Sequence, residues 1–442
     1  MSRVRNVLKN FTCVALLCTA IALTYAVWSY TMGVSGTGLL LRAFGIGEQT
    51  ATLNTGYEEM SYAVRAVTPL NCAVRADQSA GLYGTTDRET SSACFERMGA
   101  VLAEALATAE EPVLATSYQW RDALSGTMVF MDFGGRVPLA ALARLLGARA
   151  PESLTDAARY VVLSIEESEE GRRAALYYKS DDRTILRCQT DADADYLIAL
   201  SSDLRANGYR FAYEEGLADA REVLLLTPQT TAPEITAYNV LLTAAESDYD
   251  RIMEDVLEGF GFNAYMPRVY NESDGTRVYV EEERTLRVSG DGRIAYYDPL
   301  AAGAEVYMPD EEEQTACIAE ASRLASGILA SYIGDAELFL LDASYDEESE
   351  LFIVRFGAEC GSIRILTART ATATCEFRGG ELSAANLELV TYRRTGVNTA
   401  IIPATQALAA APYTGGFGLY YRVTERLADA GWYVEEAVKR ES

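Results

Sequence analysis

The feature of this sequence that most constrains its fold is a long uncharged stretch close to the N-terminus. Residues 10–41 contain no charged side chain. A helix needs about 20 apolar residues to cross the hydrocarbon core of a bilayer, and residues 11–33 supply that length. Trp28 and Tyr30 lie where interfacial aromatic residues are expected at the end of such a helix. We therefore predict an uncleaved transmembrane signal-anchor at residues 11–33.

The charges that precede this stretch predict its orientation. Arg3, Arg5 and Lys9 carry all the charge in the first 41 residues. Positively charged flanks stay in the cytoplasm, so residues 1–10 should be cytoplasmic and the chain after the span extracytoplasmic, at the cell membrane. A cleaved signal peptide is the alternative. Its apolar region normally spans only about 7–15 residues, and the best cleavage sequence, at residues 33–35, is a poor one.

Small residues recur along the predicted span. Cys18, Ala22 and Ala26 are spaced four residues apart, which places them on one face of a helix. Small side chains allow a second helix to approach closely, and van der Waals packing is a main source of helix association in lipid. We predict that this stripe contacts another transmembrane helix. The alternative is composition alone, because alanine is common in apolar runs.

The charge balance excludes several classes of function. The chain has 38 basic and 64 acidic residues, a formal net charge of −26, and no histidine. An excess of acidic residues argues against binding to nucleic acid or to anionic lipid. The absence of histidine removes Ser-His-Asp triads, Cys-His pairs and HExxH zinc sites. We therefore predict no catalytic, cofactor-binding or metal-binding residues, although no pair of carboxylates can be singled out or dismissed among so many acids.

Two short motifs resemble known sites but lack the context that those sites need. Asp132-Phe133-Gly134 spells the magnesium motif of protein kinases, without the other kinase motifs, and we interpret it as the junction between a strand and a turn. The acidic residues of Asp191-Ala-Asp-Ala-Asp195 match the start of an EF-hand loop. That loop requires Gly at the sixth position and Glu at the twelfth, where Tyr196 and Ser202 stand, so we interpret the segment as a helix N-terminus.

Six cysteines lie beyond the predicted span and allow fifteen disulfide pairings, among which the sequence alone cannot choose. Cys360 and Cys375 could face each other across a hairpin that turns near Ala368-Arg369, so we regard them as a possible disulfide. Cys317 lies on the apolar face of a predicted helix. The alternative is that most of these cysteines are small buried residues, because a chain of this length does not need disulfides to fold.

Hydrophobic periodicity predicts an α+β fold with mostly antiparallel sheets, because runs of strands alternate irregularly with separate helices. We expect extracytoplasmic units at residues 34–150, 151–232 and 233–442. A Gly134-Gly135 turn and a short helix after Pro138 are expected within the first unit. The longer expected helices cover residues 92–108, 192–205, 247–259, 311–332 and 404–411. The expected strands cover residues 127–132, 160–166, 174–179, 184–188, 276–281, 285–289, 293–297, 338–344, 351–356, 362–367, 371–377, 387–393 and 419–423.

A diffuse set of sequence features begins with the short basic N-terminus and the single span. The other features are Trp120–Leu124, Val137-Pro138, Gly259–Phe262, Thr276–Glu281, Thr285–Arg287, Asp291–Tyr296, Pro403–Leu408 and Gly431–Val434. Together they resemble the YycH/YycI family. The resemblance covers nearly the whole chain, and the length and layout are more similar to YycH, with residues 233–442 similar to the module that the two proteins share.

The resemblance implies a function, since members of this family are single-pass extracytoplasmic proteins of Gram-positive bacteria that regulate the WalK sensor histidine kinase. It implies a non-catalytic regulator linked to cell-wall homeostasis, with a sensor histidine kinase and a paralogous YycH/YycI-type protein as partners. Two alternatives make different structural demands. A carboxylate-based cell-envelope hydrolase needs a cleft with two converging acids, and an anchored small-ligand sensor needs an apolar pocket with a few inward polar groups.

Overall fold

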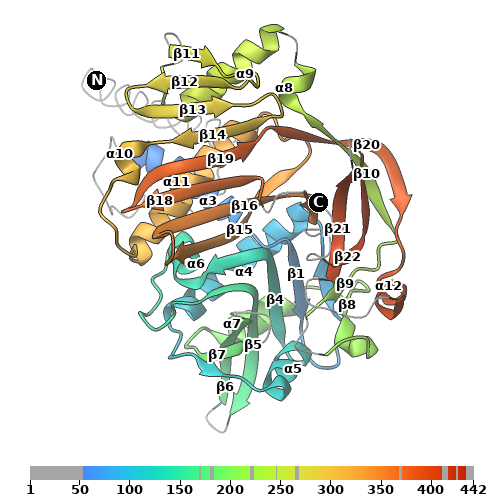
Figure 1. Ribbon diagram of the computed structural model, residues 1–442. Helices are drawn as coiled ribbons and strands as arrows, with labels where there is room; N and C mark the ends of the chain where they lie inside the picture. Colours follow the sequence, from blue (N-terminus) through green and yellow to red (C-terminus); the bar gives the residue numbers. More distant parts are fainter. Residues whose placement is uncertain are drawn as a thin grey trace, which may run out of the picture. The chain divides into compact units, whose positions relative to one another are not determined.

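The computed structural model of the chain describes residues 53–168, 171–179, 184–219, 223–244, 246–263, 268–367, 371–410, 417–424 and 427–434 (Figure 1). Residues 57–442 cluster as one unit. The expected cytoplasmic N-terminus, the expected span and its stripe of Cys18, Ala22 and Ala26 lie outside the described residues. Within the described ranges, no helix is both long enough and apolar enough to cross a membrane.

The first sheet is antiparallel and has the strand order β3-β7-β6-β5-β4-β1-β2. Its two faces are both buried, because Val129 and Met131 point into one hydrophobic core while Phe130 points into another. The position expected to separate two units, residue 150, falls between two neighbouring strands of this sheet. The strands are β1 (Asn71–Arg75), β2 (Tyr83–Thr85), β3 (Val113–Leu114), β4 (Met128–Pro138), β5 (Ala157–Ser168), β6 (Gly171–Lys179) and β7 (Ile185–Gln189).

Helices cover the two faces of the first sheet. α4, α6 and α7 contribute to the core that contains Val129, whereas α5 packs with Phe130 through Trp120 and Leu124. α4 begins four residues before its predicted start, because Asp87 caps it by accepting a hydrogen bond from the Thr90 amide. The helices are α3 (Leu53–Ala66), α4 (Arg88–Ala107), α5 (Ser117–Ser125), α6 (Leu139–Leu145) and α7 (Ala194–Ser202), followed by η1 (Ala212–Glu215) and the small sheet of β8 (Arg210–Phe211) and β9 (Leu225–Leu226).

A second set of strands continues the hydrogen-bonded network in the order β11-β12-β13-β14-β19-β18-β16-β15, all antiparallel (Figure 1). The first half of β16 pairs with β18 and its second half pairs with β17. From β17 the strand order continues β21-β22-β10-β20, in which each strand pairs with the next. These strands are β10 (Thr231–Asn239), β11 (Arg268–Asn271), β12 (Arg277–Glu281), β13 (Arg284–Val288), β14 (Arg293–Tyr297), β15 (Glu337–Asp346), β16 (Leu351–Cys360), β17 (Ile363–Leu366), β18 (Ala373–Arg378), β19 (Glu381–Glu388), β20 (Val390–Ala400), β21 (Phe417–Thr424) and β22 (Leu427–Val434).

The long helix α11 supplies much of the core beside these strands. Asp310 and Glu313 form a capping box at its start, as the acidic first turn predicts, and Cys317, Leu324 and Ile328 are buried along one stripe. The mixed α+β class with a large, mostly antiparallel sheet is therefore confirmed. The remaining helices are α8 (Val240–Thr243), α9 (Glu246–Gly259), α10 (Pro299–Ala302), α11 (Glu311–Leu329) and α12 (Ala404–Ala410).

The Gly134-Gly135 segment is a strand, and the turn predicted there is wrong. β4 continues through both glycines, and its pairing with β5 is interrupted between Asp132 and Val137. In this interval Arg136 pairs with Asp342 of β15 in parallel. A Cβ atom on Gly135 would lie 2.2 Å from the carbonyl oxygen of Leu340. Gly135 is needed because the backbone of β4 approaches the backbone of β15. Gly134 is needed because its φ is 75° and a Cβ atom there would lie 2.3 Å from the Leu70 side chain.

Candidate functional site

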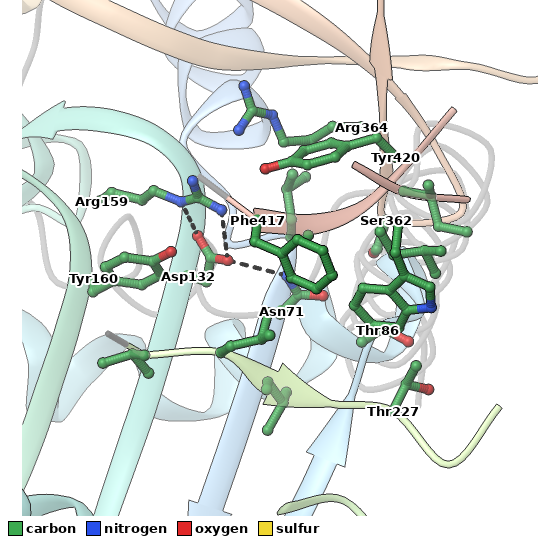
Figure 2. Close-up of a pocket in the computed structure, with 18 of the residues that line it drawn as sticks. Asn71, Thr86, Asp132, Arg159, Tyr160, Thr227, Ser362, Arg364, Phe417 and Tyr420 are labelled. Carbon is green, nitrogen blue, oxygen red and sulfur yellow. Dashed lines mark hydrogen bonds and ion pairs between the residues drawn. The ribbon is translucent and has the colours of Figure 1, made fainter. Parts of the chain in front are cut away.

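A pocket lies where the first sheet meets the strands β17, β21 and β22 (Figure 2). Its walls come from β1, β4 and β5 on one side and from β17, β21 and β22 on the other, with the segment 223–229 closing a third side. The cavity has a volume of about 80 Å³. A single water needs roughly 10–15 Å³ of such space, so the cavity holds several waters or a small ligand group.

Asp132 is the centre of the polar wall of this pocket. Arg159 donates to both of its carboxylate oxygens, from Nε at 2.8 Å and from Nη2 at 3.2 Å. Asn71 donates to the same carboxylate at 3.3 Å, and the amide of Gly134 donates at 2.9 Å. Figure 2 shows the Asn71 and Arg159 side chains converging on this carboxylate from β1 and β5. The bidentate geometry and the extra donors make this a well-satisfied pair, in which Asp132 is buried and Arg159 is partly exposed.

The pair is ionised. Burial alone would raise the pKa of Asp132, but the charge and the hydrogen bonds of Arg159 outweigh burial and hold this pKa below its ordinary value. Burial would likewise lower the pKa of Arg159, and Asp132 raises it well above the ordinary value. Among the described residues that line the pocket, Asp132 is the single carboxylate. An ionised acid bound to arginine cannot donate a proton, so this pocket does not provide the paired acids that a hydrolase needs.

Aromatic rings form much of the remaining wall. Tyr160 stacks on Phe130 with ring centroids 5.9 Å apart, and Trp432 stacks on Phe417 at 5.7 Å. The guanidinium of Arg364 lies 5.4 Å from the ring centroid of Tyr420 and 5.6 Å from that of Phe339, so it is held by cation–π contacts on two rings. The aromatic side chains that line the pocket are Phe130, Tyr160, Phe417, Tyr420 and Trp432. An apolar wall with a few polar groups is the lining typical of small-ligand sites.

Ser362 adds a buried polar group to this wall. It lies in the turn between β16 and β17 with φ of 62° and is 7% exposed. Its amide donates to Glu359 at 2.6 Å, whereas its hydroxyl has no hydrogen-bond partner among the described residues. A buried hydroxyl without a partner costs free energy unless water or a ligand satisfies it. Ser362 therefore marks the place in the pocket where a bound polar atom would be stabilised.

A second polar cluster lies behind this turn, at the C-terminal end of α3. Arg88, the first residue of α4, donates to the backbone carbonyl of Arg65 at 2.8 Å and to that of Thr68 at 2.7 Å. Ser91, one turn later on the same face, donates to the carbonyl of Leu70 at 3.0 Å. α4 therefore holds the whole connection from α3 to β1.

The Arg88 guanidinium also faces two acids of the second strand set. Its Nε is 3.7 Å from Glu359 and 3.8 Å from Glu337. Glu359 is fully buried, and its Oε1 accepts no hydrogen bond from a described residue. Burial raises the pKa of Glu359 to about 7, against a partial opposing effect of Arg88, and burial lowers the pKa of Arg88. Both shifts favour neutral forms, so desolvation outweighs the attraction across this long contact.

The structure does not bring Cys360 and Cys375 together. Both are free, buried thiols. Cys375 on β18 pairs with Val354, and Cys360 at the end of β16 pairs with Ile363 of β17. The expected disulfide between them is therefore wrong. The segment after β16 forms the separate strand β17 before β18 begins, and this places the two cysteines out of register. Cys317 is buried on α11, as its position on the apolar face predicts.

The two motifs without supporting context have structural roles. Asp193 caps α7 by accepting from the Tyr196 amide, and Asp195 lies in the first turn of that helix, as predicted. Asp132-Phe133-Gly134 lies inside β4, and its aspartate is the pocket carboxylate. The sequence signal for a site was present there, because an acid inside an apolar strand requires a buried partner, but the partner Arg159 is identified only by strand pairing. Within the described residues, no cluster of three potential metal ligands occurs.

Comparisons with known proteins identify one solved structure with a similar fold. No family model matches the chain, and no curated protein matches it. Among solved structures, the crystal structure of YycH from Bacillus subtilis is similar, with a TM-score of 0.50 and 10% sequence identity. The match covers 83% of this chain and 94% of that chain. The chain therefore has a YycH-like fold, as the resemblance of its sequence motifs implied.

Proposed function

We propose that this chain is a membrane-anchored, non-catalytic extracytoplasmic regulator of a two-component sensor histidine kinase, in the manner of YycH and linked to cell-wall homeostasis. The observation that supports it most is the YycH-like fold, which extends over most of both chains. The predicted signal-anchor at residues 11–33 adds the expected membrane attachment. A paralogous YycH/YycI-type protein is the second partner in this proposal.

The mechanism of such a regulator is preferential binding to one signalling state of the kinase. A bound protein shifts a two-state equilibrium only by the difference between its affinities for the two states. In this proposal, the span contributes to the difference in affinity by packing against a transmembrane helix of the kinase. The contacting face carries Cys18, Ala22 and Ala26.

The experiment that tests this proposal places a photocrosslinking amino acid at position 22 or 26 in cells of the producing organism. The expected product contains this chain joined to a transmembrane peptide of a sensor histidine kinase. Val27, which lies off the predicted stripe, is the matched control position and should give less of the product. If position 22 crosslinks no kinase, or both positions crosslink alike, the predicted stripe is not the contact face.

A double substitution measures what the contact contributes. Ala22→Leu with Ala26→Leu should insert normally but weaken co-purification with the kinase and the response of a kinase-dependent reporter, by about 1 kcal/mol of association. External protease on spheroplasts should digest the chain beyond residue 34 in wild type and variant alike. A double variant that regulates like wild type would assign the kinase contact to the folded unit alone, and protection of residues 57–442 would refute the topology.

A second candidate function is an anchored small-ligand sensor, and the aromatic pocket with its unsatisfied Ser362 hydroxyl favours it. Trp432 lines this pocket, whereas Trp120 is buried in the core behind the first sheet. A ligand that enters should therefore change the fluorescence of the wild type but not that of the Trp432→Phe variant. A small-molecule library that gives no such difference at any concentration tested would remove this candidate.

A further inference from the structure

The thiols of Cys72 and Cys94 lie together on the contact between α4 and β1. Cys72 is in the second position of β1 and is fully buried, and Cys94 is in the second turn of α4 and is 8% exposed. The Cys72 thiol lies 3.8 Å from the Ser91 carbonyl oxygen, one turn before Cys94. Cys94 follows Ser91 on the same face of α4, and both cysteines belong to one hydrophobic core. Each thiol also shifts the pKa of the other. Both are reduced in this structure.

The position of this pair continues the contact that holds α3. Arg88, Ser91 and Cys94 are spaced three residues apart and lie on one face of α4. The first two donate to backbone carbonyls between residues 65 and 70, and the third meets Cys72 directly after them in the chain. A covalent bond at this point would join α4 to β1 where noncovalent bonds already fix both elements.

The other four described cysteines are in different surroundings. The Cys360 thiol lies 3.4 Å from the Asp335 carbonyl oxygen and also hydrogen-bonds to Arg394. Burial raises the pKa of Cys188 and of Cys317 to about 12, and it raises that of Cys375 further. Thiols of this kind remain protonated and unreactive. Of the described cysteines, Cys72 and Cys94 are the two that shift each other's pKa.

We propose that Cys72 and Cys94 form a disulfide by exchange with a disulfide oxidant, and that this bond covalently fixes α4 to β1 behind the end of α3. Exposure of the pair to an oxidising compartment rests on the extracytoplasmic placement under the proposed function. The capacity of the pair to form the bond rests only on the positions of the two thiols.

The exchange has a defined order. The neighbouring Cys72 thiol lowers the pKa of Cys94, with a further contribution from Arg97, while the Cys94 thiol and burial raise the pKa of Cys72. The Cys94 thiolate therefore attacks one sulfur of the oxidant, forming a mixed disulfide and releasing one thiolate. Once Cys94 is in the mixed disulfide it no longer raises the pKa of Cys72, and the first released thiolate takes the Cys72 proton. Cys72 then attacks the Cys94 sulfur and releases the second thiolate. The two cysteine protons pass to the released thiolates, and the two electrons leave with them.

Peptide mapping of the full-length chain in detergent tests the pairing. The chain is unfolded and refolded in a glutathione redox buffer, alkylated with N-ethylmaleimide and digested with trypsin without reductant. Cleavage after Arg65, Arg75, Arg88 and Arg97 separates the two cysteines, so the bond appears as residues 66–75 linked to residues 89–97. The linked product should predominate over every other disulfide and disappear in Cys94→Ala. Cys188→Ala is the matched control, since it removes another buried thiol of the same sheet and should leave the product unchanged.

The oxidised chain should also melt about 5 °C above the reduced chain, because the bond closes a loop of intermediate length, and Cys94→Ala should abolish this difference. Recovery of both cysteines as alkylated thiols, or of Cys94 linked to another cysteine, would overturn the proposal. Alkylation in intact cells separates it from the proposed function. A pair that oxidises in the glutathione buffer but is recovered reduced from cells refutes the extracytoplasmic placement and not the pairing.

Discussion

Replacing the buried Glu359 by glutamine should stabilise the protein at neutral and alkaline pH. The carboxylate lies 3.7 Å from Arg88, and its Oε1 receives no hydrogen bond from a described residue. The gap between an ordinary glutamate pKa of 4.5 and a pKa of about 7 corresponds to about 3 kcal/mol of lost stability when the group is ionised. Glutamine copies the neutral acid and retains an oxygen for the Ser362 amide, so Glu359→Gln should recover most of this amount.

The pH dependence has a definite sign. A folded-state pKa above the unfolded value means that the native state holds a proton that the unfolded state has lost between pH 4.5 and 7. The contribution of Glu359 is therefore fully present below pH 4.5 and lost as the pH rises through 7. The variant and wild type should have equal free energies of unfolding near pH 4.5, and the variant should gain progressively to about 3 kcal/mol at pH 8.

Urea unfolding of both proteins at intervals between pH 4.5 and 8 measures this difference. Comparing the two curves cancels the opposite contributions of acids with lowered pKa values, such as Asp132 and Glu166. Glu337→Gln is the control, since it faces the same Arg88 but is more than a third exposed, and it should change stability little at any pH. A Glu359→Gln variant that is less stable than wild type at pH 8 would refute the reasoning, because it would show that the ion pair with Arg88 is net stabilising.

Two further pairs of variants test the packing by urea unfolding. Gly135→Ala should destabilise the protein by about 2 kcal/mol or more, because the new Cβ atom would overlap the β15 backbone. Gly327→Ala, on the exposed face of α11, should stabilise it by about 0.5–1 kcal/mol. Equal effects of the two substitutions would contradict the close approach of β4 and β15. Asp132→Asn should cost about 3 kcal/mol by leaving the partly buried Arg159 without its charged partner. Glu167→Gln, in an exposed pair with Arg172, should cost less than about 0.5 kcal/mol. A tolerated Asp132→Asn would show that the pocket pair contributes little.

Local chemistry predicted the elements whose signals lie within a few residues. The buried stripes of α4 and α11 and the acidic first turn of α11 define those helices in the sequence, whereas the Asp87 cap of α4 went unrecognised. The turn at Gly290–Gly292 separates two strands of the meander as expected. The errors occur where a residue responds to a distant part of the chain. Gly134-Gly135 has the composition of a turn, but the backbone of β15, some 200 residues later, is what requires glycine at position 135.

The candidate site was harder to predict for the same reason. Asp132 and Arg159 meet because β4 and β5 pair in a particular register, and Ser362 joins them only through the packing of β17 against the first sheet. Arg88 bonds to backbone carbonyls, which carry no sequence signal at all. Cysteine spacing favoured Cys360 with Cys375, whereas the fold places Cys72 beside Cys94, a helix residue that no hairpin pattern would pair with a strand.

The dual pairing of β4 has a consequence for how the protein unfolds. One continuous strand gives Met128–Asp132 to the first sheet and Arg136 to β15 of the second strand set. Neither sheet can lose this strand without leaving buried backbone groups of the other unpaired, which costs free energy on both sides. Amides of β5 and of β15 should therefore exchange with solvent hydrogen in one shared opening event, and the described unit should melt in a single cooperative transition rather than sheet by sheet.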